Sequence, residues 1–241
     1  MNRYLNQHLL AVAIAAALLP AAALAHTPGA RIQVSAFQNH VAFGGAAGNL
    51  SGLALGIHGV SHRLGGIGVH ARLGYAVGDG ASLETLGARI VAYPHQGISP
   101  YMSLGAVDLS SLSGATSATT SYQVNTSTGA IVPTTITTPL PPVGVAMGFG
   151  FVGLRGRYAL NPRMSLVAHA ALGEGVGGSV TGLAASAPGS STLATSYGVG
   201  MRYRVTKAMD ARLVYSRTSI PVRGSTFKSG GVSVGMSYLF H

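Results

Sequence analysis

The stretch Ile67–Val77, IGVHARLGYAV, decides the fold because its residues alternate in character along its whole length. The odd-numbered positions are apolar throughout, whereas the even-numbered positions hold glycine, alanine, His70 and Arg72. A period of two residues indicates a β-strand whose two faces meet different surroundings.

The same alternation recurs in Val143–Phe151, Tyr197–Val205 and Val232–Phe240. In each stretch one face carries large apolar side chains, and the other carries mainly glycine, alanine, serine or arginine. The apolar face of a soluble sandwich looks inward, but that of a membrane barrel contacts lipid. We therefore predict that the large side chains face lipid. In the stretch Val143–Phe151 these are Val143, Val145, Met147, Phe149 and Phe151.

The composition suits a membrane better than water. Of the 241 residues, only 8% are charged, 35 are glycine and none is cysteine, whereas roughly a quarter of the residues of a soluble domain are charged. After the N-terminal segment, no stretch approaches the roughly 20 uninterrupted apolar residues of a membrane helix. A closed β-barrel is the other structure that satisfies its backbone hydrogen bonds in lipid.

Ten segments have the pattern and length of membrane-crossing strands. They span residues 31–44, 50–61, 66–77, 83–93, 99–109, 143–158, 163–176, 195–206, 210–218 and 229–240. We predict an all-β fold, a transmembrane antiparallel up-and-down β-barrel of ten strands. Eight strands remain the alternative if two of the glycine-rich segments do not form strands.

The N-terminus has the features of a secretory signal peptide. Arg3 supplies a positive charge, Leu9–Leu19 is an unbroken apolar run, and Ala23–Ala25 offers a small-x-small cleavage site. We expect residues 1–25 to be cleaved and residues 26–241 to form one barrel domain. This export route predicts the outer membrane of a Gram-negative cell envelope.

Segment 110–142 is the longest predicted connection; it is rich in serine and threonine and carries no charge. We expect a flexible external loop with a strand extension around Tyr122 and Ile131, serving either as a tether without a partner or in recognition. The connections at 62–65, 94–98, 159–162 and 207–209 are short, which is typical of the periplasmic side.

Aromatic residues fall near the predicted strand ends, as expected of the two interfacial girdles of a barrel. The periplasmic girdle would contain Tyr93, Tyr101, Tyr158, Tyr203, Tyr238 and Phe240. The external girdle would contain Phe43, Tyr75, Tyr197 and Tyr215.

Several motifs resemble those of known barrels. Val232–Phe240 resembles the C-terminal signal read by the barrel-assembly machinery, although His241 follows the final aromatic residue. Tyr158–Leu166 resembles the periplasmic hairpins of the small OmpA-like barrels, and Gly52–Gly56 with the following strand is loosely similar to the YfaZ type. The resemblance implies an outer-membrane barrel assembled by that machinery, and it transfers no catalytic residue.

Catalytic and metal-binding constellations are not evident. His58, His70 and His169 are expected on inward faces, but they lack the short ligand spacing of a metal site. Only five residues are acidic, and those at the predicted rim are best interpreted as solvated charges. We therefore predict no enzyme activity, no cofactor and no metal.

The predicted inward faces also carry basic residues: Arg72, Arg89, Arg202, Arg204 and Arg212. With few acids to pair with them, these arginines raise the hypothesis of a passage for anions. A small barrel is nonetheless mostly filled by its own side chains, so a plugged structural barrel is favoured.

The sequence thus predicts a non-enzymatic outer-membrane barrel with a structural or surface-interaction role. A small porin-like passive channel for anionic solutes is the first alternative, and a lipid-modifying enzyme at the rim is the second. We expect a monomer in contact with outer-membrane lipid and lipopolysaccharide. Nucleic-acid binding is not expected, because the formal net charge of +10 is not concentrated in any Lys/Arg run.

Overall fold

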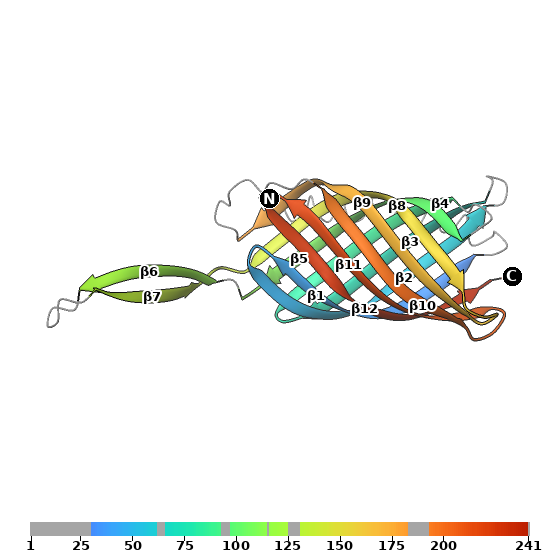
Figure 1. Ribbon diagram of the computed structural model, residues 1–241, viewed down its shortest axis with the longest axis horizontal. Helices are drawn as coiled ribbons and strands as arrows, with labels where there is room; N and C mark the ends of the chain where they lie inside the picture. Colours follow the sequence, from blue (N-terminus) through green and yellow to red (C-terminus); the bar gives the residue numbers. More distant parts are fainter. Residues whose placement is uncertain are drawn as a thin grey trace.

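The computed structural model describes residues 30–61, 66–92, 97–114, 116–124, 131–182 and 193–240. Ten strands form a closed antiparallel barrel, and two more form a separate two-stranded sheet (Figure 1). The barrel strands are β1 (Arg31–Phe43), β2 (Ala46–Ser61), β3 (Ile67–Gly78), β4 (Ala81–Ala92), β5 (Ile98–Leu112), β8 (Val143–Ala159), β9 (Met164–Thr181), β10 (Ala194–Arg204), β11 (Met209–Val222) and β12 (Ser225–Leu239). The predicted signal peptide lies outside the described residues.

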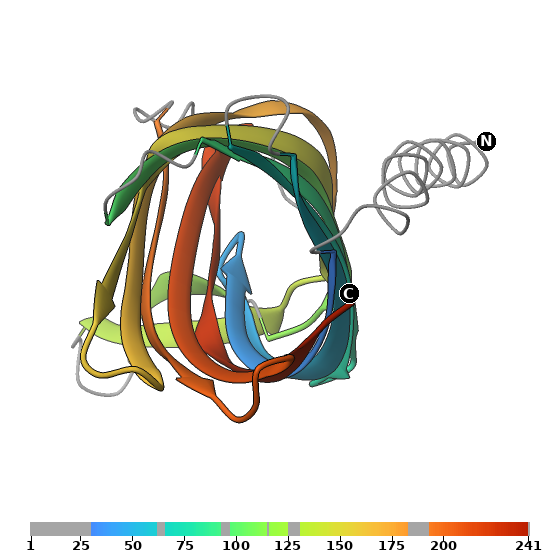
Figure 2. The ribbon, with the colours of Figure 1, turned by 90° about the vertical axis from the view of Figure 1, so that its right-hand side faces the viewer.

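The topology is up-and-down, and each barrel strand pairs with its neighbours in sequence. The ring closes where β1 pairs with β12, from Arg31 opposite Leu239 to Ala42 opposite Lys228. Seen from the end where β1 begins and β12 ends, the strands form an unbroken ring (Figure 2). The prediction of ten strands is confirmed, and the eight-stranded alternative is wrong.

Strand β5 pairs directly with β8, so the residues between them leave the barrel. They form β6 (Thr116–Val124) and β7 (Ile131–Pro139), which pair only with each other and project beyond one end of the barrel (Figure 1). We call this end the hairpin end and the opposite one the terminal end. The expected loop is therefore largely a β-ribbon, consistent with the high β-propensity of threonine and with cross-strand contacts such as Thr120 Oγ1 to Thr135 Oγ1 at 3.3 Å.

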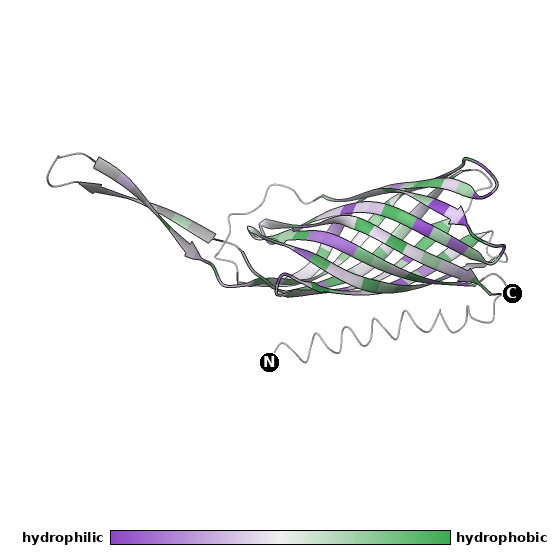
Figure 3. Ribbon diagram, turned by 90° about the horizontal axis from the view of Figure 1, so that it is seen from below, coloured by the Kyte–Doolittle hydropathy of each residue, from purple (hydrophilic) through white to green (hydrophobic). Residues whose placement is uncertain are grey.

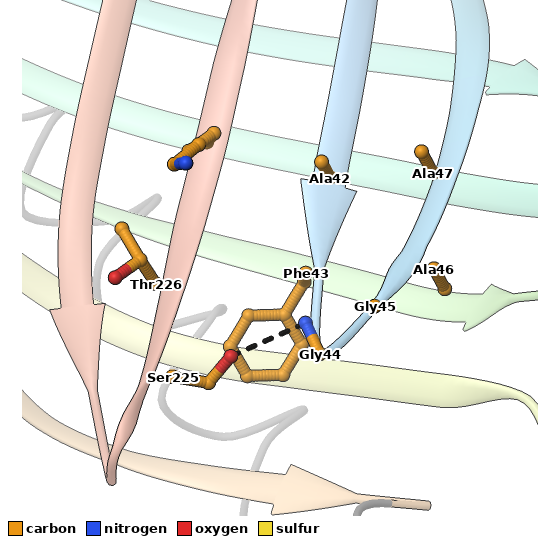
Figure 4. A pocket seen from close by; sticks show the side chains of 9 residues that line it. Ala42, Phe43, Gly44, Gly45, Ala46, Ala47, Ser225 and Thr226 are labelled. Carbon is orange, nitrogen blue, oxygen red and sulfur yellow. Dashed lines mark hydrogen bonds between the residues drawn. The ribbon is translucent and has the colours of Figure 1, made fainter. Parts of the chain in front are cut away.

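The other connections at the hairpin end include three two-residue turns. In the turns Asp79–Gly80 and Arg223–Gly224 both central residues have positive φ, which is typical of the type I′ turns that match strand twist. The turn at Gly44–Gly45 is of the same length, and Gly44 N–H donates to Ser225 Oγ at 3.2 Å beside a shallow pocket (Figure 4). Loop length therefore distinguishes the two ends less than the sequence suggested.

Bands of high and low hydropathy alternate along the strands (Figure 3). Successive side chains of a strand point to opposite faces, so the alternation separates those on the outer surface from those in the interior. The large apolar residues of β3, β10 and β12 are exposed on the outer surface, as predicted; examples are Leu73, Val199 and Val234. Within the described residues, no helix is long and apolar enough to cross a bilayer.

In strand β8 the large apolar face points into the barrel, so the prediction that it meets lipid is wrong. Val143, Val145, Met147 and Phe151 are buried inside the barrel, and the Phe149 ring packs where a side chain on Gly105 would otherwise lie. Val152, on the opposite face, is 67% exposed. The physical reason is that Arg155 and Arg157 share a face with these apolar residues, and a lipid-facing arginine is costly.

Candidate functional site

The barrel interior has two chemically different halves. Toward the hairpin end, fully buried apolar side chains from seven strands pack into one cluster, which we call the apolar plug. The plug consists of Val41, Phe43, Leu50, Leu83, Leu109, Leu112, Val143, Val145, Ile220 and Phe227.

Between the plug and the terminal end lies a cavity of about 860 Å³, which we call the basic cavity. Leu83, Ile220 and Phe227 belong to both, so the plug forms the wall of the cavity on that side. Seven arginines and three histidines line the cavity, and no aspartate or glutamate is among its described lining residues.

Small residues on the inner wall make room for the histidines. A Cβ at Gly198 would come within 2.5 Å of His169 Cε1, and one at Gly56 would come within 3.0 Å of His70 Nε2. His58 and His70 lie on paired positions of β2 and β3, with ring centroids 6.1 Å apart. The glycines of the small-residue face thus determine where the polar side chains of the cavity sit.

Asp210 is the acidic group nearest to this basic lining. The residue is 3% exposed, and its Oδ2 accepts hydrogen bonds from both Arg31 and Arg202. These arginines come from β1 and β10, on either side of the β11–β12 pair. A single carboxylate therefore neutralises part of the positive charge at the terminal end.

Three of the other arginines contact neutral groups. Arg212 Nη1 donates to Gln33 Oε1 at 3.3 Å, and Arg157 Nε donates to Ser165 Oγ at 3.2 Å. The Arg72 guanidinium lies 5.9 Å from the centroid of the Phe37 ring. In the described part of the chain, the buried Arg212 Nε has no hydrogen-bond partner.

The family model described as outer membrane protein β-barrel domain matches residues 9–240. The chain belongs to this family of outer-membrane barrels. No curated protein matches it.

Solved structures with a similar fold include three barrels. The translocator domain of the autotransporter NalP from Neisseria meningitidis is 15% identical, covers 91% of this chain and 92% of its own, and has a TM-score of 0.44. Neisserial surface protein A is 13% identical, with 88% and 97% covered and a TM-score of 0.37. Ail of Yersinia pestis is 9% identical, with 88% and 100% covered and a TM-score of 0.35. These similarities are too distant to indicate an activity for this outer-membrane barrel.

The structure brings four of the five arginines expected inside into the basic cavity: Arg72, Arg89, Arg202 and Arg212. Arg204 instead lies exposed at the last residue of β10, because the cavity does not extend to the end of that strand. The sequence reasoning missed Arg31, Arg155 and Arg157, which also line the cavity. Arg155 and Arg157 of β8 are both odd-numbered, like the apolar residues of that strand. This common face could have indicated that both arginines point inward.

Phe43 and Tyr101 were expected in the aromatic girdles, and both expectations are wrong. Phe43 is 1% exposed and belongs to the apolar plug. Tyr101 is 4% exposed and lines the cavity, with the Arg89 guanidinium 4.5 Å from its ring centroid and the His169 ring centroid at 6.5 Å. Tyr101 shares its face of β5 with Ser103, Val107 and other inward residues, so its position near a strand end did not make it interfacial. Seven other girdle residues have exposed side chains: Tyr75, Tyr158, Tyr197, Tyr203, Tyr215, Tyr238 and Phe240. Tyr215 lies midway along β11, and Tyr93 lies outside the described residues.

Two acidic residues at the hairpin end contact or lie opposite residues other than histidine. Asp79 Oδ2 accepts a hydrogen bond from Asn49 N–H at 2.6 Å, and Glu84 of β4 lies opposite Asp108 of β5 in the strand register. Within the described residues, no group of three histidines or carboxylates is arranged to hold a metal ion.

Proposed function

We propose that this barrel is a non-enzymatic surface protein whose hairpin end lies outside the cell and whose β6–β7 ribbon contacts other surfaces. The observation that carries the proposal is the projection of an uncharged ribbon beyond the barrel (Figure 1). Tyr122 and Ile136 are 73% and 58% exposed on it. Such apolar side chains on an exposed strand pair are suited to contact with a partner.

The orientation can be tested directly because the chain contains no cysteine. We expect Thr120→Cys, on the ribbon, to react with a membrane-impermeant maleimide on intact cells. The matched variant Lys207→Cys, in the β10–β11 turn at the terminal end, should react only after the outer membrane is permeabilised. The reverse labelling pattern would contradict the proposed orientation.

The interaction role is tested with a variant in which two glycines replace residues 115–139. Cells that express the intact chain should sediment by aggregation, or adhere to matrix-coated plates, more than cells that express equal surface amounts of the variant. Equal behaviour in both assays would overturn the role of the ribbon.

The channel for anionic solutes remains the second candidate, and the arginine lining of the basic cavity favours it. The apolar plug argues against it, because conduction requires a continuous aqueous path. For a rim enzyme the arrangement is less favourable: Ser165 accepts its hydrogen bond from Arg157 and His169 packs against Tyr101.

For partners, we propose that the exposed apolar belt contacts outer-membrane lipid and lipopolysaccharide. The apolar face of β12 that includes Val234 and Tyr238 supports recognition by the barrel-assembly machinery. We further propose that the chain acts as a monomer, follows a cleaved signal peptide into the outer membrane, and binds no nucleic acid.

A further inference from the structure

We propose that the basic cavity is a dead-end binding site for a small, multiply charged anion of the phosphate class, which enters from the terminal end. This inference concerns the inside of the barrel and does not depend on the role of the β6–β7 ribbon. It rests on the charge of the cavity, on the donors that remain available in it, and on its shape.

The cavity carries an excess of positive charge. Seven arginines line it, and in the described part of the chain ion pairs join Asp210 to two of them. Asp210 already holds Arg31 and Arg202. The positive charge of the remaining arginines is enclosed by the barrel wall, where like charges repel more strongly than in bulk water. A bound anion with several charges would relieve this repulsion.

Several arginines of the cavity have hydrogen-bond donors available for a ligand. Each guanidinium has five N–H donors in a planar fork that matches the oxygens of a phosphate. Arg155 and Arg72 make no hydrogen bond to another described side chain, and the buried Nε of Arg212 has no partner among the described residues. These donors belong to β8, β3 and β11, so they converge from different sides of the ring.

The cavity has the size of a ligand site and is bounded by apolar side chains at one end. Its volume of about 860 Å³ falls in the range of roughly 300–1,000 Å³ that small-molecule sites occupy. Arg31, Ala159 and Leu239 line it near the terminal end, whereas Leu83 and Phe227 of the apolar plug bound it on the other side. A charged ligand can therefore approach from the terminal end but would meet apolar side chains if it continued.

The test uses the mature chain, folded in an amine-oxide detergent that contributes no phosphate. Inorganic tripolyphosphate is titrated calorimetrically at constant ionic strength. We expect saturable binding, weakened at least about tenfold in the double variant Arg155→Gln/Arg212→Gln. The control Arg217→Gln/Arg223→Gln removes the same charge from residues that do not line the cavity and should bind like the parent protein.

Folding is checked by the shift in gel mobility between unboiled and boiled samples. If the double variant does not fold, Arg155→Gln alone provides the test, because Arg155 makes no hydrogen bond to a described side chain that its loss would break. Absence of saturable binding to the parent protein would overturn the proposal. Equal weakening in the cavity and control variants would overturn it as well, because binding would then reflect net charge.

The phosphate group can come from a soluble molecule or from a lipid headgroup, and competition distinguishes these sources. Displacement of tripolyphosphate by soluble glycerol 3-phosphate would support the phosphate site and identify a free metabolite as the ligand type. Displacement only by phosphatidylglycerol in mixed micelles would support the same site with a lipid headgroup as its occupant.

Discussion

The guanidinium of Arg89 lies over the ring of Tyr101, with Cζ 4.5 Å from the ring centroid. Both residues line the basic cavity, on the paired strands β4 and β5. A cation over an aromatic face is stabilised by the ring quadrupole, and the contribution grows when the pair is shielded from water. Tyr101 therefore helps to accommodate an arginine inside the barrel.

The first prediction concerns this pair. Tyr101→Leu should lower the free energy of unfolding by about 1–2 kcal/mol, because Arg89 loses the aromatic face while most of the apolar volume is kept. Urea titration followed by gel mobility measures the change. Tyr197→Leu, on the outer surface, is the matched control in liposomes. An equal or greater loss in the control would show that the tyrosine–arginine contact contributes nothing.

A second prediction concerns Asp210. Asp210→Asn removes the charge that Arg31 and Arg202 share, and truncating one partner of a buried ion pair typically costs about 3–5 kcal/mol. We expect a loss of about 3 kcal/mol, since Arg31 remains partly exposed. Asp79→Asn, in an exposed turn whose conformation asparagine also adopts, should change stability by less than about 1 kcal/mol. Similar urea midpoints for the two variants would contradict this account.

The third prediction addresses conduction. The intact barrel should show near-zero conductance in planar lipid bilayers, because the apolar plug fills the interior at the hairpin end. Phe43→Ala/Phe227→Ala removes the two largest fully buried side chains of the plug and should open an anion-selective pathway through the arginine lining. Steady single-channel conductance of the unmodified protein would instead establish the channel function.

A fourth prediction separates the ribbon from the barrel. Replacing residues 115–139 by two glycines, which keeps Leu140 packed against the buried cluster, should leave the unfolding free energy within about 0.5 kcal/mol, the usual range for changes that touch no buried contact. The reason is that β6 and β7 pair only with each other, and β5 and β8 pair without them. A lost mobility shift in the shortened protein would show that the ribbon is needed for folding.

The strand pattern was predictable because a period of two is a local property of the sequence. The same pattern separates two faces without saying which one meets lipid. In β8 the apolar residues from Val143 to Phe151 point inward, and only Arg155 and Arg157 on the same face revealed this. Whether a barrel interior is polar or apolar depends on residues of strands that are distant in sequence, so the apolar plug was not predictable.

The cavity was predicted in part for the same reason. Arg72 and Arg202 lie among small residues on clearly alternating strands, and their direction follows from parity. Arg31 stands at the first residue of β1, where the pattern has barely begun. Its partner Asp210 is 179 positions away, a separation that no local pattern covers.

The shared carboxylate of Asp210 also has a consequence for assembly. Arg31 belongs to the first strand and Asp210 to the penultimate one, so the two meet only when β12 has docked against β1. Until then the carboxylate lacks half of its partners beside an unfinished edge. The ion pairs of Asp210 with Arg31 and Arg202 therefore favour ring closure, and both are present only when β1 and β12 pair in the register that sets Arg31 opposite Leu239.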